Sequence, residues 1–260
     1  MQRTDAGNTD IWLLDLNRSA PSRFTNDPEA DIAPYWSPGG DRMVFSSRRG
    51  GRFNLYEKSV AGGKAQELLA TDQTKSTTDW SRDGRFLLFR SFDPEFGVDI
   101  WAMPMTGDRK PFVVVRTKFD ERDARFSPDG SWIAYQSNDS GRFEIYVQPF
   151  GRAGERTPIS SAGGVQPQSS HNGSELFYLA LDGQLVAVPV VRSVVGQPFE
   201  IGRPAELFRV RVAAVDDVAM RQFIVSKDAT RFLLDTVVEE APSPITVILN
   251  WKPPENQSRG

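Results

Sequence analysis

A turn motif returns along this chain about every 45 residues, and this spacing limits the fold more than any other feature. Each clear copy begins with an aromatic residue and a serine and ends with glycine. The clear copies span 36–40, 80–84 and 126–130, and weaker ones span 169–173 and 225–229. Their last positions are 44, 46, 43 and 56 residues apart. Such regular spacing indicates a repeat protein.

A second motif keeps the same spacing. It has a polar residue, then isoleucine or leucine, then tryptophan or tyrosine, at 10–12, 54–56, 99–101 and 144–146. These copies follow one another in steps of 44, 45 and 45 residues. A short run rich in β-branched and aromatic residues follows each turn, as at 132–135, and turn residues bound it. Both patterns predict short strands.

The repeat unit is predicted to contain four strands. Strand a ends at the aromatic–serine pair, and a tight hairpin turn leads from it to strand b. A polar loop then leads to strand c, which holds the second motif, and strand d completes the unit. Glycine suits the hairpin because it reaches positive φ without a steric penalty. Four strands in about 45 residues are typical of a propeller blade, so we predict an all-β chain forming a β-propeller of about six four-stranded blades.

The blades are expected to form one domain over residues 1–253, with a disordered tail at 254–260, because a propeller grows by adding blades. Residues 9–25 are expected to supply only strands c and d, and 221–251 to supply strands a, b and c, the last at 245–251. Two arrangements stay open. The terminal pieces share a blade and complete a ring of six, or the chain is an open stack of four to five blades with strands missing upstream. The predicted blades lie near 1–32, 33–77, 78–123, 124–166, 167–217 and 218–253.

Charge and composition argue against several classes of function. The formal net charge of −3, with both signs interspersed, is unlike a general nucleic-acid surface. No run of about 18 apolar residues could cross a bilayer, so we expect no direct membrane insertion. The polar start at residues 1–5 is not expected to open a secretory signal. The absence of cysteine excludes disulfides, thiolate metal ligands and a cysteine nucleophile, and it leaves the compartment open.

The repeats resemble the TolB-type, WD-repeat-like β-propeller repeats of bacteria. In those repeats a Trp-Ser-Pro-Asp-Gly turn precedes an Ile-Ala-Tyr-like strand and an Asp-Ile-Tyr/Trp strand, and residues 126–146 match this order best. Residues 9–251 are also similar to the propeller that follows the kinase domain in many bacterial membrane-spanning serine/threonine protein kinases, through 9–16, 144–150 and 245–251. This narrower resemblance implies a sensing or docking region, periplasmic or extracytoplasmic if the parent spans a membrane. The chain holds no motif of the kinase itself.

We expect no catalytic residues, no metal site and no cofactor. His171 is the only histidine, it stands in a predicted hairpin turn, and no Gly-x-Ser-x-Gly elbow accompanies it. The acidic clusters lack calcium-loop spacing. The alternative is an accessory or substrate-gating propeller of a hydrolase, of serine peptidase or glycosidase type. A glycosidase would need inward carboxylates within about 10 Å of one another, and we do not expect this of the candidates Asp31, Asp79, Glu121 and Asp123.

The loops are expected to carry the function, because the strands are committed to packing. We predict that one loop face binds a protein or peptide partner and that the chain is a monomer or part of a longer chain. The sharpest charge cluster spans 48–52 and could hold a carboxylate or phosphate, although a merely solvated loop is the simpler interpretation. The candidate binding residues are Arg48, Arg49, Arg52, Asp93, Glu95, Lys118, Asp120, Arg122, Asp139 and Arg142.

Four further features carry structural expectations. The polar residue that opens each strand c should cap a loop, rather than form a ring of carboxylates around a channel. The aromatic residue that follows in strand c, such as Trp101, should pack between neighbouring blades. Ala229 replaces the turn glycine and predicts local strain or a different turn. The 56-residue spacing places an insertion-like loop at 190–203.

Overall fold

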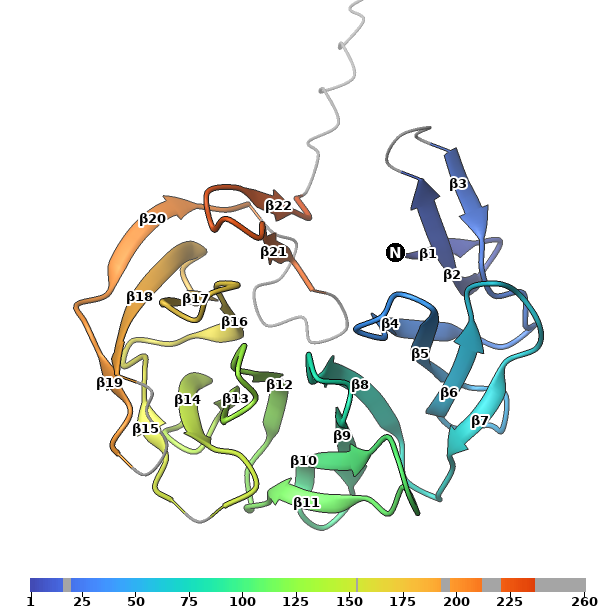
Figure 1. The fold of residues 1–260 in the computed structure, drawn as a ribbon, viewed down its shortest axis with the longest axis horizontal. Coiled ribbons are helices and arrows are strands. Elements are labelled where there is room, and N and C mark those ends of the chain that lie inside the picture. The colour runs from blue at the N-terminus through green and yellow to red at the C-terminus, as the bar shows by residue number, and fades with distance from the viewer. Residues whose placement is uncertain (16–19, 153, 193–196, 212–220, 237–260) are drawn as a thin grey trace, which may run out of the picture.

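The computed structural model describes residues 1–15, 20–152, 154–192, 197–211 and 221–236. These residues form 22 strands in six antiparallel sheets, and the sheets are arranged around a central axis (Figure 1). The β-propeller predicted from the repeats is therefore confirmed. The strand expected at 245–251 and the tail expected at 254–260 lie outside the described residues.

The first three sheets follow one another along the chain. The first contains β1 (Gln2–Asp5), β2 (Asn8–Asp15) and β3 (Ala20–Arg23). The second contains β4 (Asp31–Trp36), β5 (Arg42–Ser47), β6 (Asn54–Ser59) and β7 (Gln66–Leu69). The third contains β8 (Lys75–Trp80), β9 (Phe86–Asp93), β10 (Gly97–Pro104) and β11 (Phe112–Val115).

The next three sheets complete the described chain. The fourth contains β12 (Glu121–Phe126), β13 (Trp132–Ser137), β14 (Glu144–Pro149) and β15 (Thr157–Pro158). The fifth contains β16 (Val165–Ser169), β17 (Glu175–Leu179), β18 (Gln184–Arg192), β19 (Glu200–Ile201) and β20 (Ala205–Arg209). The sixth contains β21 (Phe223–Val225) and β22 (Phe232–Leu234).

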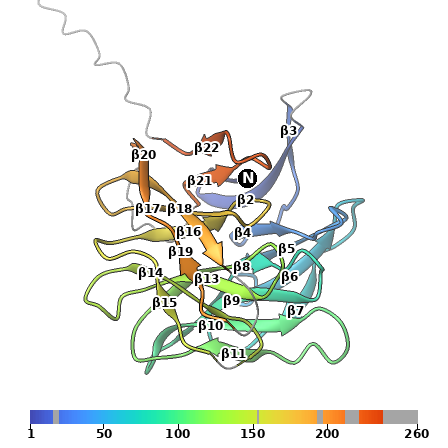
Figure 2. The same ribbon diagram turned by 60° about the vertical axis from the view of Figure 1, so that its left-hand side comes forward.

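The N-terminal piece differs from the expectation. Residues 9–25 were expected to lack strand b, but β1 pairs with β2 in register, with Gln2 opposite Ile11. Sequence patterns miss β1 because its four residues, Gln-Arg-Thr-Asp, are polar and mostly exposed. In the described chain the terminal pieces also do not share a sheet, because β1–β3 and β21–β22 form separate sheets. The two sheets are neighbours around the axis (Figures 1 and 2).

The fifth sheet holds the insertion. Strand β18 is nine residues long, and its two halves pair with different partners. Its first half pairs with β20, the outer strand of the sheet, and its end pairs with β19. The segment 190–203 was expected to be an insertion-like loop, and its described residues in β18 and β19 pair with each other and extend the sheet. This insertion accounts for the longer spacing of the last repeat.

Serine hydroxyls set the geometry of the hairpin turns. Ser127 Oγ accepts the N–H of Trp132 at 3.0 Å and donates to Asp129 at 2.5 Å, while Gly130 N–H donates to the Ser127 carbonyl at 2.9 Å. The same serine accepts the N–H five residues later in all five described copies of the turn. The motif therefore recurs because each of its members makes a defined bond in the turn.

The turn at Ala229 keeps this geometry, with φ at 58° in the left-handed region that disfavours side chains. Local strain, and not a different turn, is therefore the outcome of the missing glycine. Ala229→Gly should raise the free energy of unfolding by up to about 1 kcal/mol. The matched reverse change is Gly130→Ala, at φ 71° with no atom within 4 Å of the added Cβ, which should cost about 1 kcal/mol. Urea denaturation measures the free energy of unfolding of both variants. If both substitutions changed it in the same direction by the same amount, Ala229 would not be strained.

Aromatic stacks join the strands and the sheets. The strand c aromatics Tyr56, Trp101 and Tyr146 lie opposite strand b aromatics, with ring centroids 6.3, 6.4 and 6.0 Å apart. An arginine lies over the ring of each strand c aromatic, as Arg116 does over Trp101 at 5.2 Å. These aromatics belong to or pack against core clusters that span adjacent sheets, as Trp101 packs against the cluster that includes Val44 of β5 and Phe89 of β9. The expected packing between blades is confirmed.

Replacing Trp101 with alanine should therefore lower the free energy of unfolding by about 3 kcal/mol, because the ring packs against Phe89, Arg116 and the core of two sheets. Trp36 is a matched control, since it ends its strand with 48% of its surface exposed. Trp36→Ala should cost less than about 1 kcal/mol. Chemical denaturation of both variants tests this. Equal losses of unfolding free energy would show that the stacked Trp101 contributes no more to stability than the exposed Trp36.

Candidate functional site

One repeated position supplies the side chains at the axis. The innermost strands of the second to fifth sheets are β4, β8, β12 and β16 (Figure 1). Each has a β-bulge, and the first residue paired after the bulge stands directly before the aromatic–serine motif or its weaker copy. These four equivalent residues are Tyr35, Asp79, Arg125 and Gln168.

The bulges change the direction of the strands at the axis. Three of the unpaired residues have positive φ without being glycine: Ala33 at 50°, Asp123 at 51° and Gln166 at 57°. Bulges locally increase twist and redirect side chains, and non-glycine residues at positive φ cluster at functional positions. We therefore treat the axis as the candidate site.

A cavity of about 220 Å³ opens there between the third, fourth, fifth and sixth sheets. Its lining is strongly positive, with three arginines and one aspartate among the nine residues. Of the five uncharged lining residues, two are aromatic, two are serines and one is a glutamine. The lining consists of Asp79, Trp80, Arg82, Arg125, Phe126, Ser127, Gln168, Ser169 and Arg221.

Arg125 is the most unusual residue of this cavity, because it is a buried cation without a counter-ion. Its exposed fraction is 9%, and one nitrogen donates to the Tyr35 hydroxyl and the Thr78 carbonyl. Its Nε is buried without a hydrogen-bond partner, and no carboxylate of the described residues forms an ion pair with it. Burial, followed by the nearby charge of Arg221, lowers the pKa of Arg125. A buried charge in this state is costly unless a ligand compensates it.

Arg221 approaches the same tyrosine. It donates to the Tyr35 hydroxyl, as Arg125 does, and the two guanidinium carbons lie 5.0 and 5.1 Å from the tyrosine ring centre. Asp79 and Asp123 are close enough to Arg221 to interact with its charge. Two cations from different sheets therefore converge on one phenol oxygen, which cannot neutralise either of them.

Asp79 and Gln168 have structural bonds across neighbouring sheets. Asp79 accepts the N–H of Phe126 at 2.8 Å. The Gln168 amide donates to the Phe223 carbonyl at 2.8 Å and accepts the N–H of Val225 at 3.2 Å. These two side chains join sheets at the axis through their own hydrogen bonds. The arginines are therefore the groups of the cavity that can still bind a ligand.

Burial raises the pKa of Asp79 to about 6. The folded protein then binds more protons than the unfolded chain between about pH 4 and 6, so Asp79 should make stability fall as pH rises through this window. Arg82 and Arg221 face Asp79 and oppose the shift. The rise from 3.8 to about 6 corresponds to at most about 3 kcal/mol, and water in the cavity should reduce this to about 1–2 kcal/mol.

Thermal melts of the protein and its Asp79→Asn variant between pH 4 and 7 test this expectation. The variant should gain about 2–6 °C relative to the parent as the pH rises. A constant difference between the two melting temperatures would show that Asp79 does not titrate in this range.

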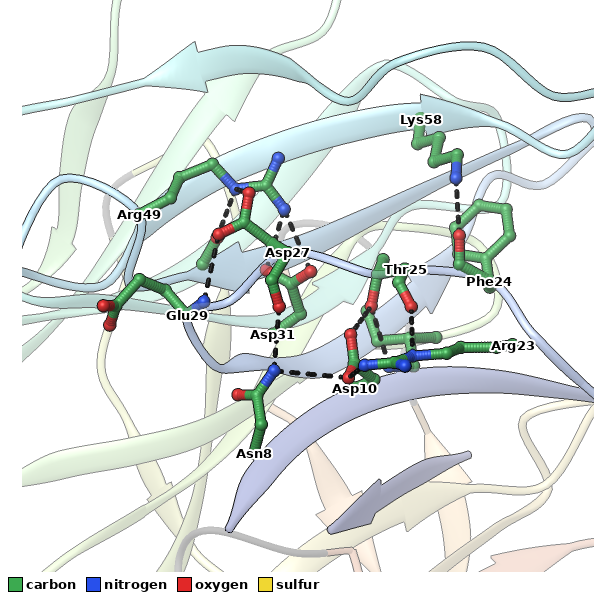
Figure 3. A network of polar contacts seen from close by, with 12 residues as sticks. Asn8, Asp10, Arg23, Phe24, Thr25, Asp27, Glu29, Asp31, Arg49 and Lys58 are labelled. Atoms are coloured by element: carbon green, nitrogen blue, oxygen red, sulfur yellow. Dashed lines mark hydrogen bonds and ion pairs between the residues drawn. The ribbon is translucent and has the colours of Figure 1, made fainter. Parts of the chain in front are cut away.

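Arg49, the central residue of the predicted loop cluster, is held by neighbouring side chains (Figure 3). It donates to both carboxylate oxygens of Asp31, at 3.0 and 2.9 Å, and to Ser47 at 2.7 Å. Its guanidinium also lies 4.8 Å from the ring centre of Tyr56. These contacts tie the b–c loop to the start of strand a and leave Arg49 little freedom to bind a partner.

Other loop candidates have similar local partners. Arg142 pairs with Glu144 at 2.8 Å, and Asp120 pairs with Arg122 at 2.5 Å. Asp139 accepts the Tyr146 hydroxyl at 2.7 Å and forms an ion pair with Arg156. Two more candidates bond to other loops: Arg52 donates to the Asp72 carbonyl at 2.6 Å, and Asp93 accepts from Gln73 at 2.7 Å.

Three candidates remain available on the described loops. Arg48, Glu95 and Lys118 are exposed, and no side-chain hydrogen bond or ion pair to another described residue holds them. The structure therefore does not gather the ten candidates into one site, and their role in binding stays a prediction. Sequence reasoning missed Arg125 and Arg221. For Arg125 a signal exists, since it occupies the position before the aromatic–serine pair in a repeat.

The polar residues that open strand c are buried and hydrogen-bonded to neighbouring segments. They do not form a ring of carboxylates around the channel. Asp10 accepts from Thr25 at 3.0 Å and pairs with Arg23 (Figure 3), and Asp99 pairs with Arg116 at 2.8 Å. The structural interpretation of this position is supported. The expected bonds to backbone N–H groups occur at Asn54, which accepts from Thr71, and at Glu144, which accepts from Gly163. Side chains near the end of strand d or in the loop after it supply most of the other bonds.

The four carboxylates proposed for a glycosidase do not share one environment. Asp31 and Glu121 are fully buried and hydrogen-bonded, Asp31 to Arg49 and Glu121 to Thr117 and Ser137. Asp79 lines the axial cavity and Asp123 lies near Arg221, so two of the four approach the axis.

The remaining candidates for chemistry give little support to catalysis. His171 lies in an exposed turn, and the nearby charges of Arg82 and Lys227 contribute to lowering its pKa. Its carbonyl accepts from Arg82 at 2.6 Å. Within the described ranges, no group of three or more His, Cys, Asp or Glu side chains could hold a metal ion. No helix of the described chain has the length and apolar character to cross a bilayer.

Comparison with known proteins agrees with the propeller fold. Residues 1–122 match the family model described as "TolB beta propeller domain". The chain is similar to the uncharacterized protein Atu1656 of Agrobacterium fabrum, with 26% identity over 208 residues, covering 62% of this chain and 70% of that protein. It is also similar to the uncharacterized peptidase YuxL of Bacillus subtilis, with 25% identity over 175 residues. That match covers 53% of this chain and only 26% of YuxL.

Solved structures support the fold. The crystal structure of TolB from Acinetobacter baumannii superposes with a TM-score of 0.60 and 17% identity, covering 78% of this chain and 50% of that one. At this identity the likeness concerns the fold alone. Together with the family match, it supports a TolB-type propeller.

Proposed function

We propose that this chain is a non-enzymatic β-propeller binding module for a protein or peptide partner. The observation that carries the proposal is the axial cavity of about 220 Å³, in which Arg125 is buried without a counter-ion among the described residues. A rigid concave site with a few converging polar groups is the usual form of a binding site. Propeller loops on the faces can add contacts to such a site.

The finer proposal is that the module is the sensor or docking region of a bacterial receptor serine/threonine kinase, or part of a TolB-like protein. The similarity of 9–16 and 144–150 to kinase-associated propellers supports the first version, and the match of 1–122 supports the second. In a membrane-spanning parent the module would lie outside the cytoplasm. Arg48, Glu95 and Lys118 are the loop residues most available for such docking, because they are exposed.

A second candidate function is an accessory or gating propeller of a hydrolase. The similarity to a protein named as a peptidase favours it. In that case the partner of the propeller would be a hydrolase domain, and the propeller would control access to that domain. Among the described residues no serine hydroxyl hydrogen-bonds to the side chain of His171, the chain's only histidine. In this function too the chain would act as a binding partner and would have no catalytic role of its own.

Selection from a random displayed peptide library tests the first proposal. The immobilised 260-residue chain should enrich a peptide consensus, because a preformed charged cavity selects for shape and charge. The Arg221→Gln variant is the control, since it removes an exposed charge that lines the cavity. Peptides that bind at the axis should bind this variant at least about tenfold more weakly.

The outcomes of the selection separate the candidates. A consensus whose binding needs Arg221 supports the axial site. A consensus that ignores Arg221 but is lost in Arg48→Ala and Lys118→Ala supports the loop face instead. Absence of any enrichment, from a chain that melts cooperatively, would contradict the peptide-binding proposal.

A further inference from the structure

A second cavity adjoins the axial one. It has a volume of about 150 Å³ and lies between the fourth and fifth sheets, on the side of the hairpin turns. Ser127 and Ser169 line both cavities, so the two are neighbours across a shared wall. We call the second cavity the interblade slot.

The walls of the interblade slot are largely apolar. Trp132 and Phe199 lie with their ring centroids 5.1 Å apart. The other apolar residues of the lining are Pro128, Ala134, Val147, Leu176 and Val190. The polar part of the lining is at the turns, including Asn172. An apolar cavity of about 150 Å³ is large enough for a benzene-sized group. The slot therefore suits one aromatic or branched aliphatic side chain.

The axial cavity has the opposite chemistry. It places Arg82, Arg125 and Arg221 against a single lining carboxylate, Asp79. Guanidinium groups match a carboxylate in shape and charge, and the Nε of Arg125 lacks a partner. Asp79 and Asp123 near Arg221 reduce the local positive charge, which favours a carboxylate with one negative charge over a doubly charged phosphate.

We propose that the chain recognises a peptide segment in which an acidic residue stands close to an aromatic or branched aliphatic one. The carboxylate binds between Arg125 and Arg221, and the apolar side chain enters the interblade slot past Ser127 and Ser169. This inference rests on the proposed function as a peptide-binding module and specifies its ligand. We take a peptide as the occupant because neighbouring side chains of one peptide can place a carboxylate in the axial cavity and an apolar group in the adjoining slot.

Three matched peptides test the pairing. The first is acetyl-Gly-Ser-Glu-Ser-Phe-Gly-Ser with a fluorescent label at its C-terminus, the second has glutamine in place of glutamate, and the third has serine in place of phenylalanine. Fluorescence anisotropy should show the first binding at least about tenfold more tightly than either of the others, since each loses one of two anchors. Versions with one and with two residues between the anchors cover the spacing.

Variants of the protein assign the two anchors. Arg221→Gln should remove the preference for glutamate over glutamine and leave the preference for phenylalanine. Val190→Asp, at the wall of the slot, should do the reverse. The control is Arg85→Gln, an exposed arginine whose ion pair among the described residues is with Asp83 of its own turn, and it should leave all affinities unchanged. Thermal melts confirm that each variant is folded.

Equal binding of the glutamate and glutamine peptides at every spacing would overturn the inference, and so would a glutamate preference that survives Arg221→Gln. Library selection distinguishes this failure from failure of the binding function. A consensus without an acidic residue refutes the acidic–apolar ligand and leaves the binding module in place. Absence of any consensus contradicts both.

Discussion

The bulge in each innermost strand is the constraint on which the rest of this propeller depends. It interrupts the ladder between strands a and b at the same point in four sheets. The backbone groups that leave the ladder must find other partners, and side chains from a neighbouring sheet supply some of them, as Gln136 does for the N–H of Gln166 at 2.9 Å. The same interruption places one side chain per sheet at the axis. Sheet association and ligand chemistry are thus determined at one position.

The repeat makes most of this fold readable from the sequence. Serine, aspartate and glycine at fixed offsets each make a bond in the turn, so their spacing marks the hairpins and hence the sheets. The strand c aromatics could also be predicted from the sequence, because packing between sheets requires a large ring at the same position of each repeat. Strand β1 could not be found in this way. Its polar residues carry no strand pattern, and it is held by its neighbour β2.

The candidate site was much less predictable, for two physical reasons. Charge on a loop does not reveal whether a partner lies within the protein, and Arg49 is occupied by Asp31 and Ser47. Arg125 and Arg221 come from different sheets and meet only after the ring forms, at a tyrosine distant from both in the sequence. Residue type alone does not predict that these two arginines approach each other. The position of Arg125 in its repeat does identify it as an axial residue.

Tyr35 joins three sheets that are not consecutive along the ring. Its hydroxyl receives N–H groups from the fourth sheet and from the segment that begins the sixth, while its own strand belongs to the second. Tyr35 therefore connects sheets across the centre of the ring, in addition to the contacts that connect neighbouring sheets around it. A carboxylate that takes those N–H groups competes with Tyr35 for the same donors. Occupation of the axis and stiffness of the ring are coupled through one phenol oxygen.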